Sequence, residues 1–294
     1  MEIKVIGGFC PGVERAYRMV LKLQENNPDK QVVLLGELVH NKDVITKLEE
    51  KGVMSVNSID ELMNIKTDKK ILPIIRAHGT TIKQEDYLKS WLRERYGSTD
   101  VEYIDLTCIY VKKGPQKSAA EFSNLGYKVV VFGKRGHPEV EGIASRAKEH
   151  VVYESVDEIN PADFIEVKRV CTVAQTTSEI DKYSRLAARL KELGLEVESV
   201  DTYCSATKEN QAGIKEIAKW AELAIVVGGI NSSNTKKLYE ICSRDVKTYM
   251  IENSNGLMRE WFIDKPKRIG IAAGASTPLW VIDDVKEAVE RYYV

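Results

Sequence analysis

The stretch Gly8-Phe9-Cys10-Pro11-Gly12-Val13 decides the fold, because its surroundings return twice along the chain. A short aliphatic run, residues 3–6, precedes Cys10, and a helical pattern follows it. The same order of strand, cysteine and helix recurs at Cys108 and at Cys204, at intervals of 98 and 96 residues. This regular spacing predicts three copies of one unit, each with its cysteine where a strand gives way to a helix.

Other landmarks keep the same period. His40, His137 and Asn234 each follow an aliphatic strand, and they stand 97 residues apart. Strands and helices alternate throughout, which favours parallel sheets with crossover helices. We therefore expect an α/β protein, a trefoil of three pseudo-equivalent α/β domains, each with a mainly parallel sheet, around a central cluster cavity.

The period also gives the domain boundaries. We expect domain 1 over residues 12–106, domain 2 over 107–201, domain 3 over 1–11 and 202–286, and a C-terminal tail over 287–294. Each domain then has an ordinary size for a structural unit.

The composition excludes several classes of protein. Lys and Arg total 43 against 44 Asp and Glu, so no net field attracts nucleic acid or an anionic membrane surface. No apolar run reaches the roughly 18 residues of a membrane span, and no signal-type segment begins the chain. Five cysteines, an odd and small number, fit reduced thiols used for metal binding or catalysis. We expect a cytoplasmic protein without nucleic-acid or membrane partners.

The three periodic cysteines suit an iron–sulfur cluster better than zinc. Cys10, Cys108 and Cys204 form no local C-x-x-C pair, which zinc fingers usually have. Three thiolates leave one iron of a cluster without a protein ligand, and that iron can act as a Lewis acid toward a substrate oxygen. The alternative is three ordinary cysteines at strand ends. Cys171 and Cys242 lie in apolar segments, and we predict that both belong to the core.

Polar side chains follow the predicted strands and should gather at the carboxyl ends of the sheets. His40, His78 and His137 occupy such turns, and residues 231–237 open a helix whose N–H groups and hydroxyls can bind phosphate. An ordinary helix cap explains that segment equally well. Glu139 is a candidate proton donor, although spacing alone leaves Glu141, or a solvated carboxylate, open.

Together these motifs resemble the LytB family of 4-hydroxy-3-methylbut-2-enyl diphosphate reductases. The resemblance covers nearly the whole chain and depends on motifs that are specific only in combination. They are GFCPGV around Cys10, ELVHN around His40, AHG around His78, TC at Cys108, GHPEVEG over 136–142, QTT over 175–177, the cysteine at 204, NSSN over 231–234 and AGAST over 273–277.

The resemblance implies a [4Fe-4S] cluster on Cys10, Cys108 and Cys204. Thr176 would orient the substrate hydroxyl, and Glu139, with His137, would deliver protons. The implied ligands of the substrate diphosphate are His40, His78, His137, Ser232, Ser233, Asn234 and Ser276. The implied reaction is a two-electron reductive dehydroxylation of the substrate to isopentenyl and dimethylallyl diphosphate, in the non-mevalonate isoprenoid pathway. A ferredoxin or flavodoxin would donate the electrons.

Two positions depart from the family pattern. Ile109 and Tyr110 follow Cys108, where the family usually has proline, and Pro11 follows Cys10, where a small or aromatic residue is more usual. A LytB-like paralogue that reduces a different substrate is therefore one alternative. The other is a non-enzymatic iron–sulfur or zinc protein that binds or senses, although such a protein has no need of a proton donor like Glu139.

Overall fold

The computed structural model describes residues 1–99 and 101–293. They form two compact units, one from residues 1–18, 39–51 and 205 onward, the other from residues 19–38 and 52–204. Asp100, inside predicted domain 1, and Val294, the end of the predicted tail, lie outside the described residues. Within the described ranges, no helix combines the length and the apolar character needed to span a membrane.

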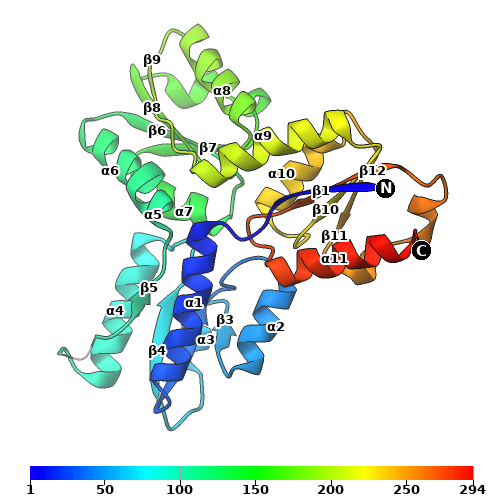
Figure 1. Ribbon diagram of the computed structural model, residues 1–294. Helices are drawn as coiled ribbons and strands as arrows, with labels where there is room; N and C mark the ends of the chain where they lie inside the picture. Colours follow the sequence, from blue (N-terminus) through cyan, green and yellow to red (C-terminus); the bar gives the residue numbers. More distant parts are fainter. Residues whose placement is uncertain (100, 294) are drawn as a thin grey trace. The chain divides into compact units, whose positions relative to one another are not determined.

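The first unit contains one parallel sheet that joins the two ends of the chain. Its strands, in spatial order, are β1 (Glu2–Gly7), β12 (Arg268–Ala273), β10 (Leu223–Val227) and β11 (Thr248–Ile251). β1 pairs with β12 along its whole length, from Glu2 opposite Arg268 to Gly7 opposite Ala273. Figure 1 shows β1 in dark blue among the strands of the last third of the chain. The start of the chain therefore completes a sheet built by its last third.

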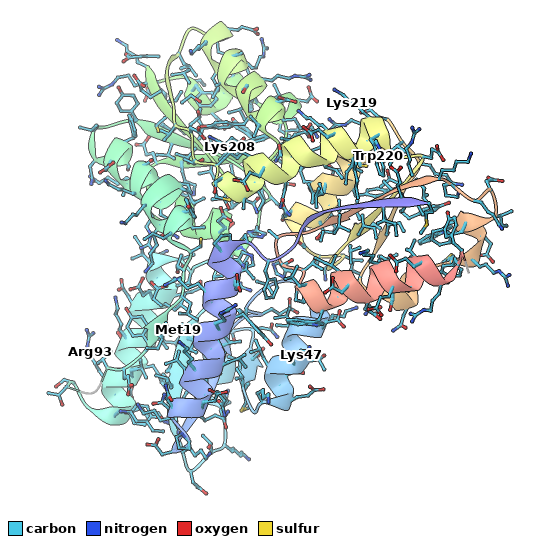
Figure 2. All side chains as sticks on the ribbon, viewed as in Figure 1. Met19, Lys47, Arg93, Lys208, Lys219 and Trp220 are labelled. Atoms are coloured by element: carbon cyan, nitrogen blue, oxygen red, sulfur yellow. The ribbon has the colours of Figure 1, made fainter. Side chains whose placement is uncertain are left out.

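Helices cover both faces of this sheet. α11 (Leu279–Arg291) packs Val281, Val285 and Val289 against one face. α9 (Ser205–Trp220) and α10 (Ser233–Cys242) pack against the other face. Residues 287–291 of the predicted tail are part of α11. At the end of α9, the Nζ of Lys4 lies 4.2 Å from the centroid of the Trp220 ring, which is labelled in Figure 2.

The second unit contains two more parallel sheets. One has the order β3 (Met54–Val56), β2 (Lys30–Leu35), β4 (Lys70–Ile75) and β5 (Ile104–Asp105); the other has the order β7 (His150–Tyr153), β6 (Lys128–Phe132), β8 (Arg169–Ala174) and β9 (Glu196–Ser199). The inner strands β2, β4, β6 and β8 are rich in buried aliphatic residues, as suits parallel strands that are covered on both faces.

The remaining helices connect these strands. They are α1 (Pro11–Asn26), α2 (Lys42–Glu50), α3 (Ile59–Met63), α4 (Ile82–Tyr96), α5 (Ile109–Val111), α6 (Lys117–Asn124), α7 (Pro138–Ala144) and α8 (Ile180–Glu192). A π-helical turn (Lys112–Gln116) lies between α5 and α6, and four short 3-10 helices occur at Val156–Glu158, Pro161–Phe164, Ser254–Gly256 and Arg259–Phe262.

All three sheets have the same topology, which is seen when the strands of the first sheet are read from β11 to β1. In each, the strand that leads to a periodic cysteine lies at the sheet edge: β1 before Cys10, β5 before Cys108 and β9 before Cys204. The predicted α/β fold, with three pseudo-equivalent modules that each carry a parallel sheet, is confirmed. The exact domain boundaries stay a prediction.

The structure differs from the sequence-based expectation in two details. The strand before Cys108 is only two residues long. Beyond it, the Leu106 N–H still donates to the Ile75 carbonyl and the Cys108 N–H to the Ala77 carbonyl, each at 2.9 Å. The first helix begins at Pro11 instead of near Val13. Proline suits a first helical position, because its missing N–H would have no partner inside the helix.

Candidate active site

Cys10 lies in the first unit, after a turn that requires glycine. Gly7 has a φ of 81°, and a Cβ there would lie 2.1 Å from the carbonyl oxygen of Ala273. The Cys10 N–H donates to the Ala275 carbonyl at 3.1 Å. The Val13 N–H donates to the Cys10 sulfur at 3.4 Å. The sulfur thus stands at the N-terminal end of α1, where the helix dipole favours a thiolate.

Cys108 and Cys204 lie in the second unit. Burial raises the pKa of the Cys108 thiol, and hydrogen bonds from the N–H groups of Tyr110 and Val111 lower it in part. Repulsion from Cys204 and Glu139 adds to the increase. The structure therefore brings two predicted cluster ligands and the predicted proton donor close together.

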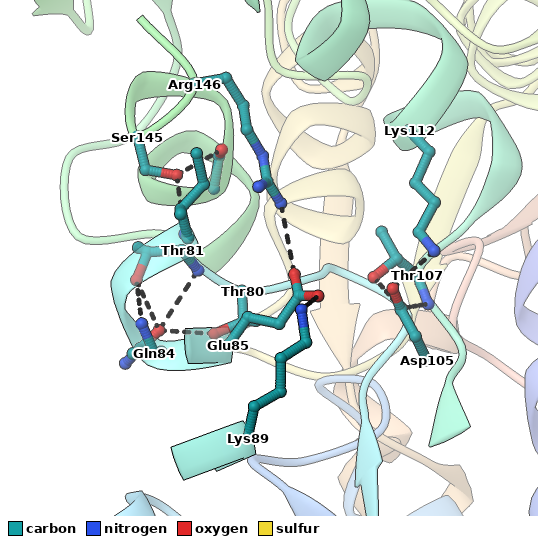
Figure 3. Close-up of polar contacts among 12 residues, drawn as sticks. Thr80, Thr81, Gln84, Glu85, Lys89, Asp105, Thr107, Lys112, Ser145 and Arg146 are labelled. Atoms are coloured by element: carbon teal, nitrogen blue, oxygen red, sulfur yellow. Dashed lines mark hydrogen bonds and ion pairs between the residues drawn. The ribbon is translucent and has the colours of Figure 1, made fainter. Parts of the chain in front are cut away.

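Asp105 anchors the chain on both sides of Cys108. Its carboxylate accepts the Thr107 N–H at 2.8 Å, and it pairs with the Nζ of Lys112 at 2.5 Å (Figure 3). Burial alone would raise the pKa of Asp105, but the bonds from Lys112 and Thr107 bring it below its ordinary value. Cys108 is thus held between two residues that bind the same carboxylate.

The other two cysteines are in the core, as predicted. Cys171 packs in β8 against α6 and α7, and Cys242 ends α10; neither side chain is exposed. Burial raises the pKa of Cys171 to about 12 and also raises that of Cys242. Both stay thiols at neutral pH, which makes them poor metal ligands.

His78 and His137 meet in the second unit. Their rings contact edge to face, with centroids 5.1 Å apart. His137 caps α7, and its Nδ1 accepts the Glu139 N–H at 3.2 Å. A neutral His137 therefore carries its hydrogen on Nε2, where it can donate to an anion.

Glu139 and Thr176 also meet in the second unit. The Glu139 side chain is only 2% exposed, and one carboxylate oxygen accepts the Thr176 N–H at 2.6 Å. Burial raises the pKa of Glu139 to about 7, with Thr176 lowering it in part. Glu141, by contrast, is exposed and accepts the Gly136 N–H at 3.2 Å. The structure therefore favours Glu139 over Glu141 as a proton donor.

Buried hydroxyls and an amide gather at the start of α10 in the first unit. Ser232 caps the helix, and the Ser276 hydroxyl lies 3.5 Å from the Ser232 hydroxyl. Ser233 is half-buried. Asn234 is buried, and its Nδ2 has no hydrogen-bond partner among the described residues. Donors left over at a helix N-terminus fit an anion, which favours a ligand site over a plain cap.

His40 reaches the same region within the first unit. A Cβ on Gly229 would lie 1.9 Å from the His40 carbonyl oxygen. The two loops are therefore so close that only glycine fits at position 229. Asn41 then caps α2 by accepting the Val44 N–H at 3.2 Å. The backbone of His40 is thus packed against the loop that leads to Ser232.

A model of the LytB protein family matches residues 3–290. The chain belongs to the LytB protein family. It is 38% identical to 4-hydroxy-3-methylbut-2-enyl diphosphate reductase of Nitratiruptor sp. over the full length of both chains. It is 41% identical to the Campylobacter hominis reductase of the same name, covering 96% of this chain and 95% of the relative. The predicted resemblance is confirmed.

A solved structure supports the LytB fold. That structure, of (E)-4-hydroxy-3-methyl-but-2-enyl diphosphate reductase, the terminal enzyme of the non-mevalonate pathway, aligns with a TM-score of 0.68 and 31% identity. The alignment covers 98% of this chain and 99% of the other.

One buried side chain of this LytB protein was missed by sequence reasoning. Gln116 is buried, and its Nε2 has no hydrogen-bond partner in the part of the chain that the structure describes. A Cβ on Gly79 would lie 3.1 Å from this Nε2, and one on Gly142 would lie 3.2 Å from it. The amide therefore fills the space that the glycines of the AHG and GHPEVEG motifs leave open. Those two glycines were the signal in the sequence, but only the fold shows what occupies the space.

Proposed function

We propose that this chain catalyses the two-electron reductive dehydroxylation of 4-hydroxy-3-methylbut-2-enyl diphosphate to isopentenyl diphosphate and dimethylallyl diphosphate. The observation that carries the proposal is Glu139, a buried carboxyl with a pKa near 7, close to Cys108, which also lies close to Cys204. A positioned acid next to metal-ligand cysteines suits an oxidoreductase that consumes protons, and a sensor would not need it. The names of the relatives agree with this assignment.

We assign Cys10, Cys108 and Cys204 as the ligands of a [4Fe-4S] cluster. The donor set fits, because none of the three cysteines is in a disulfide and the sulfurs of Cys10 and Cys108 accept backbone N–H bonds that stabilise a bound thiolate. When bound, the cluster supplies electrons one at a time and offers one iron without a protein ligand to the substrate oxygen.

We assign the substrate diphosphate to polar groups of both units. In the first unit, Ser232, Ser233, Asn234 and Ser276 offer hydroxyls and an amide at a helix N-terminus, with His40 in the adjoining loop. In the second unit, His78 and His137 stand together, and His137 can donate from Nε2. Several donors for one multiply charged anion give both affinity and orientation.

Glu139 and Thr176 act at the hydroxyl end of the substrate. The carbon–oxygen bond breaks, the hydroxyl leaves as water, and a carbon–hydrogen bond forms, consuming two electrons and two protons. With a pKa near 7, Glu139 is partly protonated at neutral pH and can deliver a proton. The Thr176 N–H fixes the Glu139 carboxyl in place, and the Thr176 hydroxyl can orient the substrate or a water molecule.

The test is anaerobic purification followed by visible absorption, iron and sulfide analysis, and product detection with chemically reduced methyl viologen as electron donor. We expect four irons per chain and formation of both products. Bound zinc, or no bound metal, would contradict the cluster assignment. A full cluster without turnover of this substrate would instead favour the alternative that the chain is a LytB-like paralogue that reduces a different substrate.

A further inference from the structure

The segment after Cys108 presents an exposed surface that the proposed chemistry does not use. We call residues 109–117 the lysine strap. Ile109 and Tyr110 are 46% and 47% exposed, although large apolar side chains usually face the core. Lys112, Lys113 and Lys117 are also exposed, and no acidic residue occurs from Leu106 to Ala120. Apolar and cationic groups are thus adjacent in one short segment.

The lysine strap is anchored to the rest of its unit. Lys112 pairs with Asp105 at 2.5 Å, an interaction drawn in Figure 3, and Pro115 and Gln116 are buried. Lys117 lies 3.4 Å from Glu121, but both side chains are more than half exposed, so this pair is weak. Lys113 makes no ion pair with any residue in the described ranges. Two cations and two apolar side chains therefore face solvent on a fixed base.

The strap is also directly connected to a predicted cluster ligand. The N–H groups of Tyr110 and Val111 hydrogen-bond to the Cys108 sulfur, so a molecule that touches Tyr110 contacts a residue that is itself bonded to that sulfur, two positions along the chain.

We propose that the lysine strap is the docking surface for a small acidic one-electron carrier protein. The inference rests on the proposed function, since it names the place where that reaction receives its electrons. Exposed lysines in the same short segment as an exposed tyrosine and isoleucine match a negatively charged partner with an apolar contact surface. Each docking event delivers one electron from the reduced carrier, so two events supply the pair that one turnover consumes.

The test compares two donors on charge-reversed variants. Lys113→Glu with Lys117→Glu reverses the strap and leaves the Lys112–Asp105 anchor intact. With a reduced acidic flavodoxin as probe, kcat/KM should fall about tenfold or more, because like charges now oppose each other. With reduced methyl viologen at high salt, where surface charge is screened, the rate should stay within about twofold of the parent.

A matched control carries the same charge change elsewhere. Lys66→Glu with Lys191→Glu alters two exposed lysines outside the strap, and it should leave both rates unchanged. Tyr110→Ala keeps the backbone N–H bond to Cys108 and should raise the KM for flavodoxin several-fold, with iron content unchanged.

Three outcomes separate the possibilities. Equal flavodoxin kinetics in the strap and control variants would overturn the docking surface while leaving the proposed function intact. A loss of self-association in Tyr110→Ala with unchanged flavodoxin kinetics would overturn it too, and would assign the patch to a second copy of the chain. No turnover by the parent with methyl viologen would instead reject the proposed function.

Discussion

Glu139 shows how burial changes the chemistry of a single residue. Two carboxylates occur two positions apart in the same short helix, and only one is enclosed. The exposed Glu141 binds its own loop through the Gly136 N–H, whereas Glu139 loses water and has its pKa raised to about 7. The proton it holds at neutral pH is therefore a consequence of its position in the fold.

Glu139→Gln should keep iron and substrate binding but lower kcat by roughly 100-fold, as expected for loss of a positioned acid. Since the acid form is the active one, parental activity should be full below the pKa near 7 and decline as pH rises through it. The variant should lack this decline. Glu141→Gln is the control, and a loss in Glu141→Gln with none in Glu139→Gln would reverse the assignment.

Substitution of a predicted cluster ligand and of a core cysteine should have opposite effects on iron content. Cys108→Ser should sharply lower both iron content and activity, because the chain loses one of three ligands. Cys171→Ser should keep full iron, because the Cys171 thiol is buried in β8. Iron and sulfide analysis of anaerobic preparations checks both variants. Full iron in Cys108→Ser, or its loss in a folded Cys171→Ser protein, would show that the ligands are misassigned.

Asn234→Ala should weaken binding of inorganic diphosphate by roughly 10- to 100-fold, the usual value of a hydrogen bond to a charged group. The reason is that the buried Nδ2 of Asn234 has no other acceptor within the described residues. Isothermal titration measures the change, with Asn26→Ala, at the end of α1, as the exposed control. Unaltered affinity in Asn234→Ala would mean that the anion binds elsewhere.

At the scale of elements, the contact between α7 and the loop after β4 sets the spacing of two histidines. Gly142 of α7 lies against the carbonyl of Thr80 and the amide of Gln116. Each of the two segments carries a predicted diphosphate ligand: His78 lies in the loop after β4, and His137 caps α7. The amide of Gln116 is therefore a spacer between them.

Gly142→Ala should raise the substrate KM about tenfold while leaving the protein folded. Its Cβ would lie 3.1 Å from the Thr80 oxygen and 3.2 Å from the Gln116 Nε2, closer than side chains normally approach, so the loops must separate. Steady-state kinetics measures the change. Adding Gln116→Ala should restore part of the affinity, because it removes one of the two contacts, and no restoration would count against the spacer role.

At the scale of the whole molecule, the fold was largely readable from the sequence. Cysteines and histidines recur at a near-constant interval because each follows a strand, so their period revealed three modules before any strand was assigned. The positions of Glu139 and Asn234 could be predicted for the same reason, since polar groups collect at the carboxyl ends of parallel strands.

What the sequence could not show depends on contacts between distant residues. The choice of Glu139 over Glu141 as proton donor required knowing which of the two is buried, and no local sequence pattern shows that. The role of Gln116 depends on glycines 37 positions before and 26 positions after it. The anchoring of the chain around Cys108 depends on Asp105, whose carboxylate binds both Thr107 and Lys112, and this is a matter of side-chain geometry.

The pairing of β1 with β12 sets an order of events during synthesis. Cys10 is translated 265 residues before Ala275, whose carbonyl accepts its N–H. At 5–20 residues per second, roughly 13 to 53 s pass between the translation of the two. Throughout that interval β1 lacks its partner strand β12, and the Cys10 thiol follows an unpaired strand. We therefore expect metal loading to be a late, post-translational event, and the newborn chain to depend on a reducing environment until its last strand is in place.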